Sequence, residues 1–291
     1  MDNICIMINQ IQFTIILLGI IFFSCGIFDS KSDEITKLYV TLQQLDQVAI
    51  YDTPELVLLK IIDIDFTGVN ITDTPHYIVL DEDHGFWFVT TMESDYIAQY
   101  SLKTDNLIDT IHVGNNPALM TIDPASNTLF CSRMNMADMP GMGGMGGMGM
   151  SQTNIINEIT YNENGLSSGR EFILDSQVLH GITYDYNKNN IFTASITDDW
   201  LYKIYLATDS TTSVTLDSSF TYHITNYPNR LQPIQIITLN DSIIAISCSG
   251  YPDEINGQVQ IWNSERMIYK ASYEFKNQSI PWHLIQSPNN N

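Results

Sequence analysis

The 291-residue sequence predicts an all-β fold: a β-propeller of five four-stranded blades, closed by pairing of the C-terminal strand with the N-terminal blade. Three observations predict this fold. Short β-rich runs occur in groups of four, the groups return at regular intervals, and the two ends of the chain carry complementary parts of one group.

A β-hairpin pattern recurs along the chain. Residues 38–51 and 87–100 share Val, Thr, Asp, Ala and Tyr in the same register. In both segments a β-rich run, a polar turn ending in Asp and a second β-rich run predict two antiparallel strands. Further copies of this pattern lie in 129–132, 191–205 and 243–262.

Two more β-rich runs flank each hairpin. The run that follows the hairpin occupies 57–62, 107–113, 171–174, 213–216 and 267–273. The run that precedes it occupies 75–81, 117–123, 180–185 and 233–239. Pro75 and Pro117 are 42 positions apart, which is a normal length for one four-stranded blade.

The ends of the chain predict how the fold closes. The first hairpin has no preceding run, whereas residues 281–291 match a preceding run and its turn. We expect the C-terminal segment to supply the missing innermost strand, because closure removes two exposed sheet edges. The alternative is a truncated propeller whose later blades are absent.

Particular residues also carry a family resemblance. Tyr39, Val40 and Thr41 match the signature of YVTN-type β-propeller repeats, and segments 110–117 and 123–129 match the family's joining segments. The chain resembles this family over 37–291, most clearly in the second blade and the start of the third. The resemblance implies a propeller fold, although members of the family more often have seven blades.

The N-terminus carries an export signal. Residues 11–23 are apolar over the length of a signal-peptide core, which is short for a membrane-spanning helix. The Ser24-Cys25-Gly26 sequence that follows resembles a bacterial lipoprotein signal, which implies cleavage after residue 24 and a lipid on Cys25. The leader lacks the positive charge usual for such signals, and an uncleaved membrane anchor is the alternative.

These features predict the domain organisation and the location. We expect a signal peptide at 1–24, a lipid-anchored tether at 25–37 and a propeller at 38–291. The protein would be exported to the cell envelope. Resemblance to Gram-negative lipoproteins, with Gly26 after the lipid-bearing Cys, favours the outer membrane; a periplasmic location is the other reading.

A methionine-rich insertion interrupts the third blade at 134–152. It holds seven of the 12 methionines, at Met134, Met136, Met139, Met142, Met145, Met148 and Met150. Thioether is a soft, neutral ligand that selects Cu(I), and copper-resistance proteins of bacterial envelopes carry comparable tracts. The tract has no His. The other readings are a low-complexity insertion, an apolar contact for partners or a sink for oxidants.

A second candidate site lies where the innermost strands begin. His76, His180 and His283 each fall within two residues of such a start, and Trp282 is adjacent. Strand starts of a propeller surround one mouth of its channel. The imidazoles could therefore share a metal ion, and Trp282 could instead plug the channel.

Other polar residues are predicted to be structural. Asp81, Asp123 and Asp185 stand at hairpin bends, where Asp bonds its own backbone. Cys131 and Cys248 lie on strands of blades that are not neighbours, so we expect two buried free thiols.

The charge balance limits the function. Twelve Lys and Arg stand against 33 Asp and Glu, giving a net charge of −21, which disfavours nucleic acid as a partner. No motif for nucleophilic catalysis occurs. We therefore expect a monomeric binding or scaffold protein that meets the membrane through its lipid and takes an unknown protein or small-molecule ligand. A propeller-type hydrolase or lactonase is a further alternative.

Overall fold

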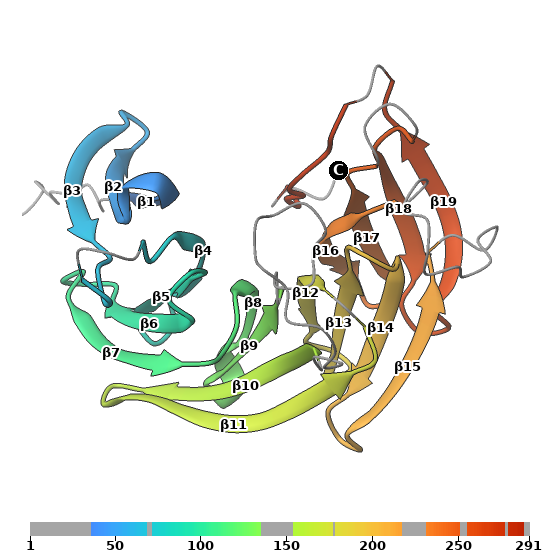
Figure 1. Ribbon diagram of the computed structural model, residues 1–291, viewed down its shortest axis with the longest axis horizontal. Coiled ribbons are helices and arrows are strands. Elements are labelled where there is room, and N and C mark those ends of the chain that lie inside the picture. The colour runs from blue at the N-terminus through green and yellow to red at the C-terminus, as the bar shows by residue number, and fades with distance from the viewer. Residues whose placement is uncertain are drawn as a thin grey trace, which may run out of the picture. The chain divides into compact units, whose positions relative to one another are not determined.

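The computed structural model describes residues 36–68, 72–134, 154–176, 178–216, 231–250, 255–276 and 279–287 (Figure 1). The chain divides into two compact units. One consists of residues 1–38 and 50–59, and the other consists of residues 39–49 and 60–291. The predicted signal peptide, Cys25 and most of the methionine-rich insertion lie outside the described residues.

The described residues form five antiparallel sheets, which we number as blades 1 to 5. Blade 1 is β1 (Thr36–Leu42), β2 (Gln47–Thr53) and β3 (Val57–Asp63). Blade 2 is β4 (Pro75–Asp81), β5 (Phe86–Thr91), β6 (Tyr96–Ser101) and β7 (Leu107–His112). Blade 3 is β8 (Pro117–Asp123), β9 (Thr128–Arg133), β10 (Asn154–Asn162) and β11 (Gly165–Leu174). Blade 4 is β12 (Leu179–Asp185), β13 (Asn190–Ser195), β14 (Trp200–Tyr205) and β15 (Ser210–Thr215). Blade 5 is β16 (Pro233–Asn240), β17 (Ile243–Cys248), β18 (Gln258–Asn263) and β19 (Ile268–Glu274). Single 3-10 turns occur at η1 (Gln43–Leu45) and η2 (Pro124–Ser126).

The runs predicted from the repeat form strands, with differences in blade 3 and at the C-terminus. In blade 3, β10 was not located by the sequence, and β11 begins at Gly165, six residues before the predicted run of 171–174. Blade 1 is three-stranded and blades 2 to 5 are four-stranded, as the missing run before the first hairpin indicated. Residues 279–287, however, are not a strand. Their backbone hydrogen bonds with described residues run to side chains of blade 5 rather than to a neighbouring strand. Closure through this segment therefore stays a prediction.

A shared register starts the innermost strands of blades 2, 3 and 5. In each, a proline opens the first strand and pairs with the last residue of the second, and an irregularity in the pairing follows. Proline is suited to this place because it has no N–H to donate to the ladder. The pairs are Pro75 with Thr91, Pro117 with Arg133, and Pro233 with Cys248.

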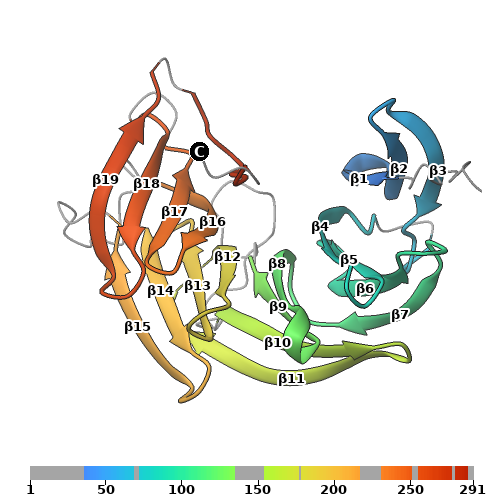
Figure 2. The ribbon, with the colours of Figure 1, turned by 180° about the vertical axis from the view of Figure 1, so that it is seen from behind.

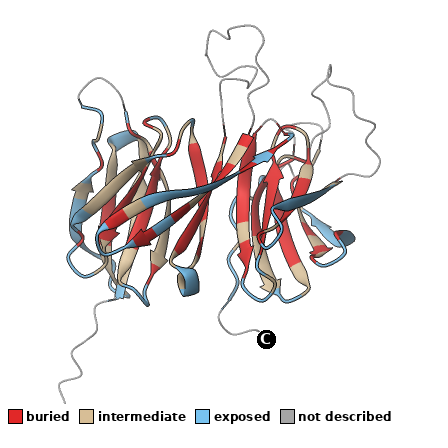
Figure 3. Cartoon of the chain, turned by 90° about the horizontal axis from the view of Figure 1, so that it is seen from below, coloured by how far each residue is buried: buried red, intermediate tan, exposed pale blue. Residues whose placement is uncertain are grey.

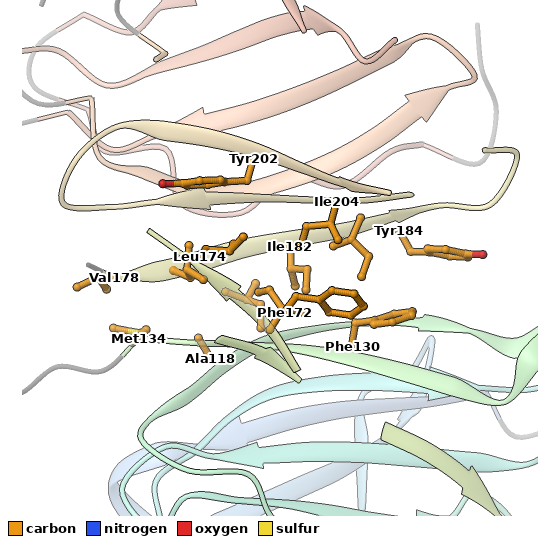
Figure 4. Close-up of a cluster of buried hydrophobic side chains, with 14 of the residues drawn as sticks. Ala118, Phe130, Met134, Phe172, Leu174, Val178, Ile182, Tyr184, Tyr202 and Ile204 are labelled. Carbon is orange, nitrogen blue, oxygen red and sulfur yellow. The ribbon is translucent and has the colours of Figure 1, made fainter. Parts of the chain in front are cut away.

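The core is divided among the joints between blades. The innermost strands β4, β8, β12 and β16 contact one another in chain order. One hydrophobic cluster fills the joint of blades 2 and 3, a second that of blades 3 and 4 (Figure 4), and a third that of blades 4 and 5. Burial differs between the strands of a blade, as the red and pale blue segments of Figure 3 show: β13 is buried throughout, β15 is largely exposed, and β19 is exposed throughout.

Turn aspartates fasten blade 1 to blade 2, blade 2 to blade 3 and blade 4 to blade 5. They follow β1, β5 and β13. Each adopts a left-handed backbone conformation, and its carboxylate accepts hydrogen bonds from backbone N–H groups just before the following innermost strand. The bonds are Thr74 N to Asp46 (2.8 Å), Asn116 N to Asp95 (2.8 Å), and Leu231 N and Gln232 N to Asp199 (2.9 and 3.0 Å). A local turn residue thus also acts across a joint.

Candidate functional site where the innermost strands begin

A hydroxyl-to-carbonyl hydrogen bond recurs where one blade meets the next. The donor is the Ser or Thr at the last-but-one position of β1, β5, β9 or β17. The acceptor is the carbonyl of the second residue of the next innermost strand or, for Ser247, that of Trp282, which follows Pro281. The bonds are Thr41 to His76 (3.5 Å), Thr90 to Ala118 (2.9 Å), Ser132 to His180 (2.6 Å) and Ser247 to Trp282 (2.8 Å). Ser247 of blade 5 thus bonds the carbonyl of Trp282 in the same way that Thr41, Thr90 and Ser132 bond the innermost strand of the next blade.

The C-terminal segment follows β16 beyond this bond. Leu284 N donates to Oε1 of Gln235 at 2.5 Å, and the side-chain amide of Gln286 donates to the carbonyl of Leu239 at 3.1 Å. Figures 1 and 2 both place this part of the chain beside β16. The sequence match between residues 281–287 and an innermost strand is thus accompanied by a matching position next to blade 5.

These contacts gather five rings, which we call the mouth cluster: His76, Tyr77, His180, Trp282 and His283. The ring centres of His76 and His180 lie 5.8 Å apart, edge to face, and those of His180 and Trp282 lie 6.4 Å apart. His283 stacks on Tyr77 at 6.2 Å. Side chains from β4, β12 and the C-terminal segment therefore meet at one place.

Each histidine of the mouth cluster is held through its Nδ1 atom. His180 donates from Nδ1 to the carbonyl of Ile234 at 2.6 Å, and His283 donates to Oε1 of Gln235 at 3.2 Å. The side-chain amide of Gln43 bonds Nδ1 of His76 at 2.5 Å. Nδ1 of every ring is thus occupied by protein.

The surroundings keep these imidazoles neutral. Burial lowers the pKa of His180 from 6.5 to about 3; the bond to Ile234 opposes this shift, and His76 and His283 add to it. Burial, together with His283, lowers the pKa of His76 to about 4. Burial also lowers the pKa of His283. Neutral imidazole is the form that binds metals or accepts protons.

The side chains of the mouth cluster differ in their exposure to solvent. His180 is 2% exposed, whereas Trp282 is 48% exposed and lies on the C-terminal segment. Within the residues that the structure describes, no three His, Cys, Asp or Glu side chains are arranged to hold a metal ion as they stand. The exposed part of the cluster consists of the Trp282 indole and the His283 imidazole.

The methionine-rich insertion is described only at its first residue. Met134 is 8% exposed and packs in the hydrophobic cluster of blades 3 and 4. It belongs to the core rather than to a metal-binding loop. Met136, Met139, Met142, Met145, Met148 and Met150 lie outside the described residues.

The two thiols are accounted for by the core. Among the described residues, Cys131 and Cys248 are both free and buried, which confirms the prediction made from their positions in the repeat. Burial raises the pKa of Cys131 to about 12 and raises that of Cys248 well above its ordinary value. Neither thiol is poised for reaction.

The hairpin aspartates bond their own turns. Backbone N–H groups of His84, Ala125 and Asn187 donate to Asp81, Asp123 and Asp185, each at 3.2 Å. Two of these carboxylates also accept from tyrosines of the next blade: Tyr161 to Asp81 at 2.7 Å and Tyr184 to Asp123 at 3.2 Å.

A cavity of about 280 Å³ lies apart from the mouth cluster, between blades 4 and 5. Aliphatic, aromatic, hydroxyl and amide groups line it, and the described lining contains no carboxylate, imidazole or amine. The lining residues are Thr215, Leu216, Leu231, Gln258, Gln260, Trp262, Tyr269 and Ser272. This lining can hold a ligand through apolar contacts and through hydrogen bonds from its hydroxyl and amide groups.

Sequence reasoning missed some partners in the mouth cluster. Tyr77, Gln43 and Gln235 were not singled out, although Tyr77 adjoins a chosen histidine. A signal existed for Tyr77 and Gln235, because both fall two residues into an innermost strand after its opening proline.

Among the described residues no helix is long and apolar enough to cross a membrane.

Searches against protein-family models and curated proteins find no match for this chain. Solved structures do match. The RRP9 WD40 repeats have a TM-score of 0.61 and 8% identity, over 82% of this chain and 60% of theirs. Hydrazine synthase of Kuenenia stuttgartiensis has a TM-score of 0.54 and 10% identity, over 74% of this chain and 52% of its own.

A third similar structure is a nidogen/laminin complex, with a TM-score of 0.52 and 12% identity, over 85% of this chain and 82% of the matched chain. The chain thus spans 52% to 60% of the length of the hydrazine synthase and RRP9 chains. At these identities the likeness shows the fold alone, and the fold is a β-propeller.

Proposed function

We propose that this chain is an exported, lipid-anchored β-propeller that serves as a non-catalytic binding or scaffold protein of the cell envelope. The observation that supports a binding role most directly is the mouth cluster, where exposed Trp282 and His283 lie beside side chains of two innermost strands. Propellers commonly use such surfaces for recognition, and one similar structure is a nidogen/laminin complex.

Site-specific photo-crosslinking in intact cells tests the binding role. A photoreactive phenylalanine replaces Trp282 in one variant and Ile173, which is 63% exposed on an outer strand, in the control. We expect a defined adduct from position 282 and none from position 173. The same adducts from both positions, or from neither, would contradict the role. Turnover of a lactone or glycoside that His180→Ala abolishes would favour the hydrolase instead.

Lipid anchoring rests on the sequence alone and has its own test. Cys25→Ser should move the protein from the membrane fraction to the soluble fraction and abolish labelling by radioactive palmitate. Cys5→Ser is the matched control, since Cys5 lies within the proposed signal peptide. Unchanged fractionation of the Cys25 variant would instead support an uncleaved membrane anchor.

We further propose that the C-terminal segment closes the propeller as the fourth strand of blade 1. The hydroxyl-to-carbonyl bond from Ser247 to Trp282 supports this, since the equivalent bond accompanies innermost strands elsewhere. The acceptor is the residue after Pro281, as it is after Pro75 and Pro117.

A second candidate function is Cu(I) handling by the methionines of the insertion other than Met134. The density of soft thioether ligands between 136 and 150 favours it. Competition with a Cu(I) chelator should show that deletion of 135–152 removes high-affinity binding while the folded domain remains. Equal affinity with and without the deletion would end this candidate.

A further inference from the structure

Two histidines of the mouth cluster already stand near a metal-binding separation. Two imidazoles on one tetrahedral ion, each bonded at about 2.0–2.1 Å, place their ring centres roughly 5 Å apart. His76 and His180 have ring centres 5.8 Å apart, with planes inclined at 73°. The separation of the two rings is therefore close to that of two imidazole ligands of one ion.

The histidines are also anchored as metal ligands are. A metal-bound imidazole characteristically has its second nitrogen bonded to a protein oxygen, which fixes the ring and its tautomer. The carbonyl of Ile234 serves this purpose for His180, and Oε1 of Gln235 serves it for His283. The amide of Gln43 fills the same place at His76, where exchange of its oxygen and nitrogen positions would supply an acceptor.

The third ring stands on the part of the site that can move most readily. His283 is exposed and lies on the C-terminal segment, which has no strand ladder to hold it. It is close enough to disfavour charge on both His76 and His180. Because no three ligands enclose an ion in the described chain as it stands, completing the site requires His283 to swing toward the other two rings.

We propose that His76, His180 and His283 bind a divalent d-block cation such as Zn²⁺ through their Nε2 atoms. Imidazole suits Zn²⁺, Ni²⁺ and Cu²⁺. The net charge of −21 favours cations near the surface. Binding would fix the C-terminal segment across β4 and β12. This site is separate from the Cu(I) candidate and does not depend on the binding role.

Competition with a chromogenic zinc chelator, using the full chain in detergent, tests the proposal. We expect one Zn²⁺ per chain, with affinity at least tenfold weaker in His76→Ala and His283→Ala. His112→Ala is the matched control, since His112 lies on outer strand β7 with its side chain 60% exposed. Deletion of 135–152 should leave Zn²⁺ affinity unchanged, because thioether is a poor Zn²⁺ ligand.

A second readout locates the ion without replacing any of the three proposed ligands. Ni²⁺ should quench the fluorescence of Trp282, whose ring centre lies 6.4 Å from that of His180. The quenched fraction should vanish in Trp282→Phe while Zn²⁺ affinity stays the same. Equal Zn²⁺ affinity in His283→Ala, His76→Ala and His112→Ala would overturn the proposal, as would quenching that persists in Trp282→Phe.

Discussion

Tyr161 shows how one side chain secures a joint between blades. Asp81 is 1% exposed, and its Oδ2 accepts from the Tyr161 hydroxyl at 2.7 Å and contacts Nδ1 of His84 at 2.8 Å. Ser264 holds the equivalent place in blade 5, since both residues donate backbone N–H to the turn before the second strand. No partner within the described chain bonds Ser264 Oγ or Oδ2 of Asp185. The bond between Tyr161 and Asp81 thus has no counterpart between Ser264 and Asp185.

Tyr161→Phe should lower the free energy of unfolding by about 1–3 kcal/mol, because it removes a bond to a buried carboxylate while keeping the ring. Urea denaturation followed by circular dichroism measures the change. Tyr186→Phe is the control, since Tyr186 is 61% exposed, and we expect a change within about 0.5 kcal/mol. Equal effects of the two variants would contradict the role of the bond.

The buried thiols make the folded state less stable at alkaline pH. Burial holds the pKa of Cys131 at about 12, against about 8.5 in an unfolded chain. The unfolded state therefore loses its proton first, and stability present below pH 8.5 decreases as pH rises, by up to about 1.4 kcal/mol per pH unit for each thiol.

A thiol-reactive dye at pH 8 should leave Cys131 and Cys248 of the native protein unlabelled and should label both in urea. Replacing both by Ala should also reduce the loss of stability between pH 9 and 10.5. Native labelling as fast as that in urea would show that the thiols are accessible.

At the scale of elements, the turn aspartates have two roles. Asp199 accepts from Leu231 N and Gln232 N, one turn residue thereby fixing the approach to β16. It also adopts a left-handed conformation with φ of 55°, which Asp and Asn tolerate better than most residues. The same residue therefore shapes its hairpin and positions the next blade.

Asp199→Ala should lower the free energy of unfolding by about 1–3 kcal/mol, because it leaves backbone donors near Leu231 without their acceptor. Asp199→Asn keeps an oxygen acceptor and should cost less than half as much. Thermal denaturation of both variants checks this order. Glu82→Ala, at an exposed turn position, is the control. Equal losses for Ala and Asn would mean that the acceptor is unimportant.

The repeat made the strands predictable but not what joins them. Asp46, Asp95 and Asp199 recur in register, so a hairpin turn was evident, yet the bond across the joint connects residues about 20 to 33 positions apart. Local patterns cannot specify such contacts.

The mouth cluster illustrates the same limit at a candidate site. The histidines could be chosen because each follows a strand start, whereas their partners Gln43 and Gln235 come from other blades. Met134 was assigned to the insertion because it is the first of the seven clustered methionines. Its burial is set by side chains such as Ala118 and Val178, which surround it only after folding.

At the scale of the molecule, the proposed closure predicts a defined register. In three blades the opening proline pairs with the last residue of the second strand, and the same pairing would place Pro281 opposite Leu42, the last residue of β1. The alignment of β4 with β5, where Ile78 pairs with Val89, then places Leu284 opposite Val40. Closure therefore predicts one pair of neighbours among many possible pairs.

Cysteines at 284 and 40 should form a disulfide within one chain under mild oxidation, detected as a shift on non-reducing electrophoresis. A one-residue slip turns a side chain to the other face of a sheet, so cysteines at 285 and 40 should not cross-link. Cross-linking of both pairs, or of neither, would contradict the register. Cross-linking between chains would show that the segment completes a second copy.

The two buried ends of the long insertion determine how well this protein tolerates insertions, deletions and substitutions between them. Met134 and Asn154 are 8% and 1% exposed, and the pairing of Ser132 with Ile156 places them as cross-strand neighbours. A turn of a few residues is enough to connect such positions. The length and sequence of the intervening chain can therefore change, in evolution or by design, without altering the strand pairing of blade 3 at its two ends.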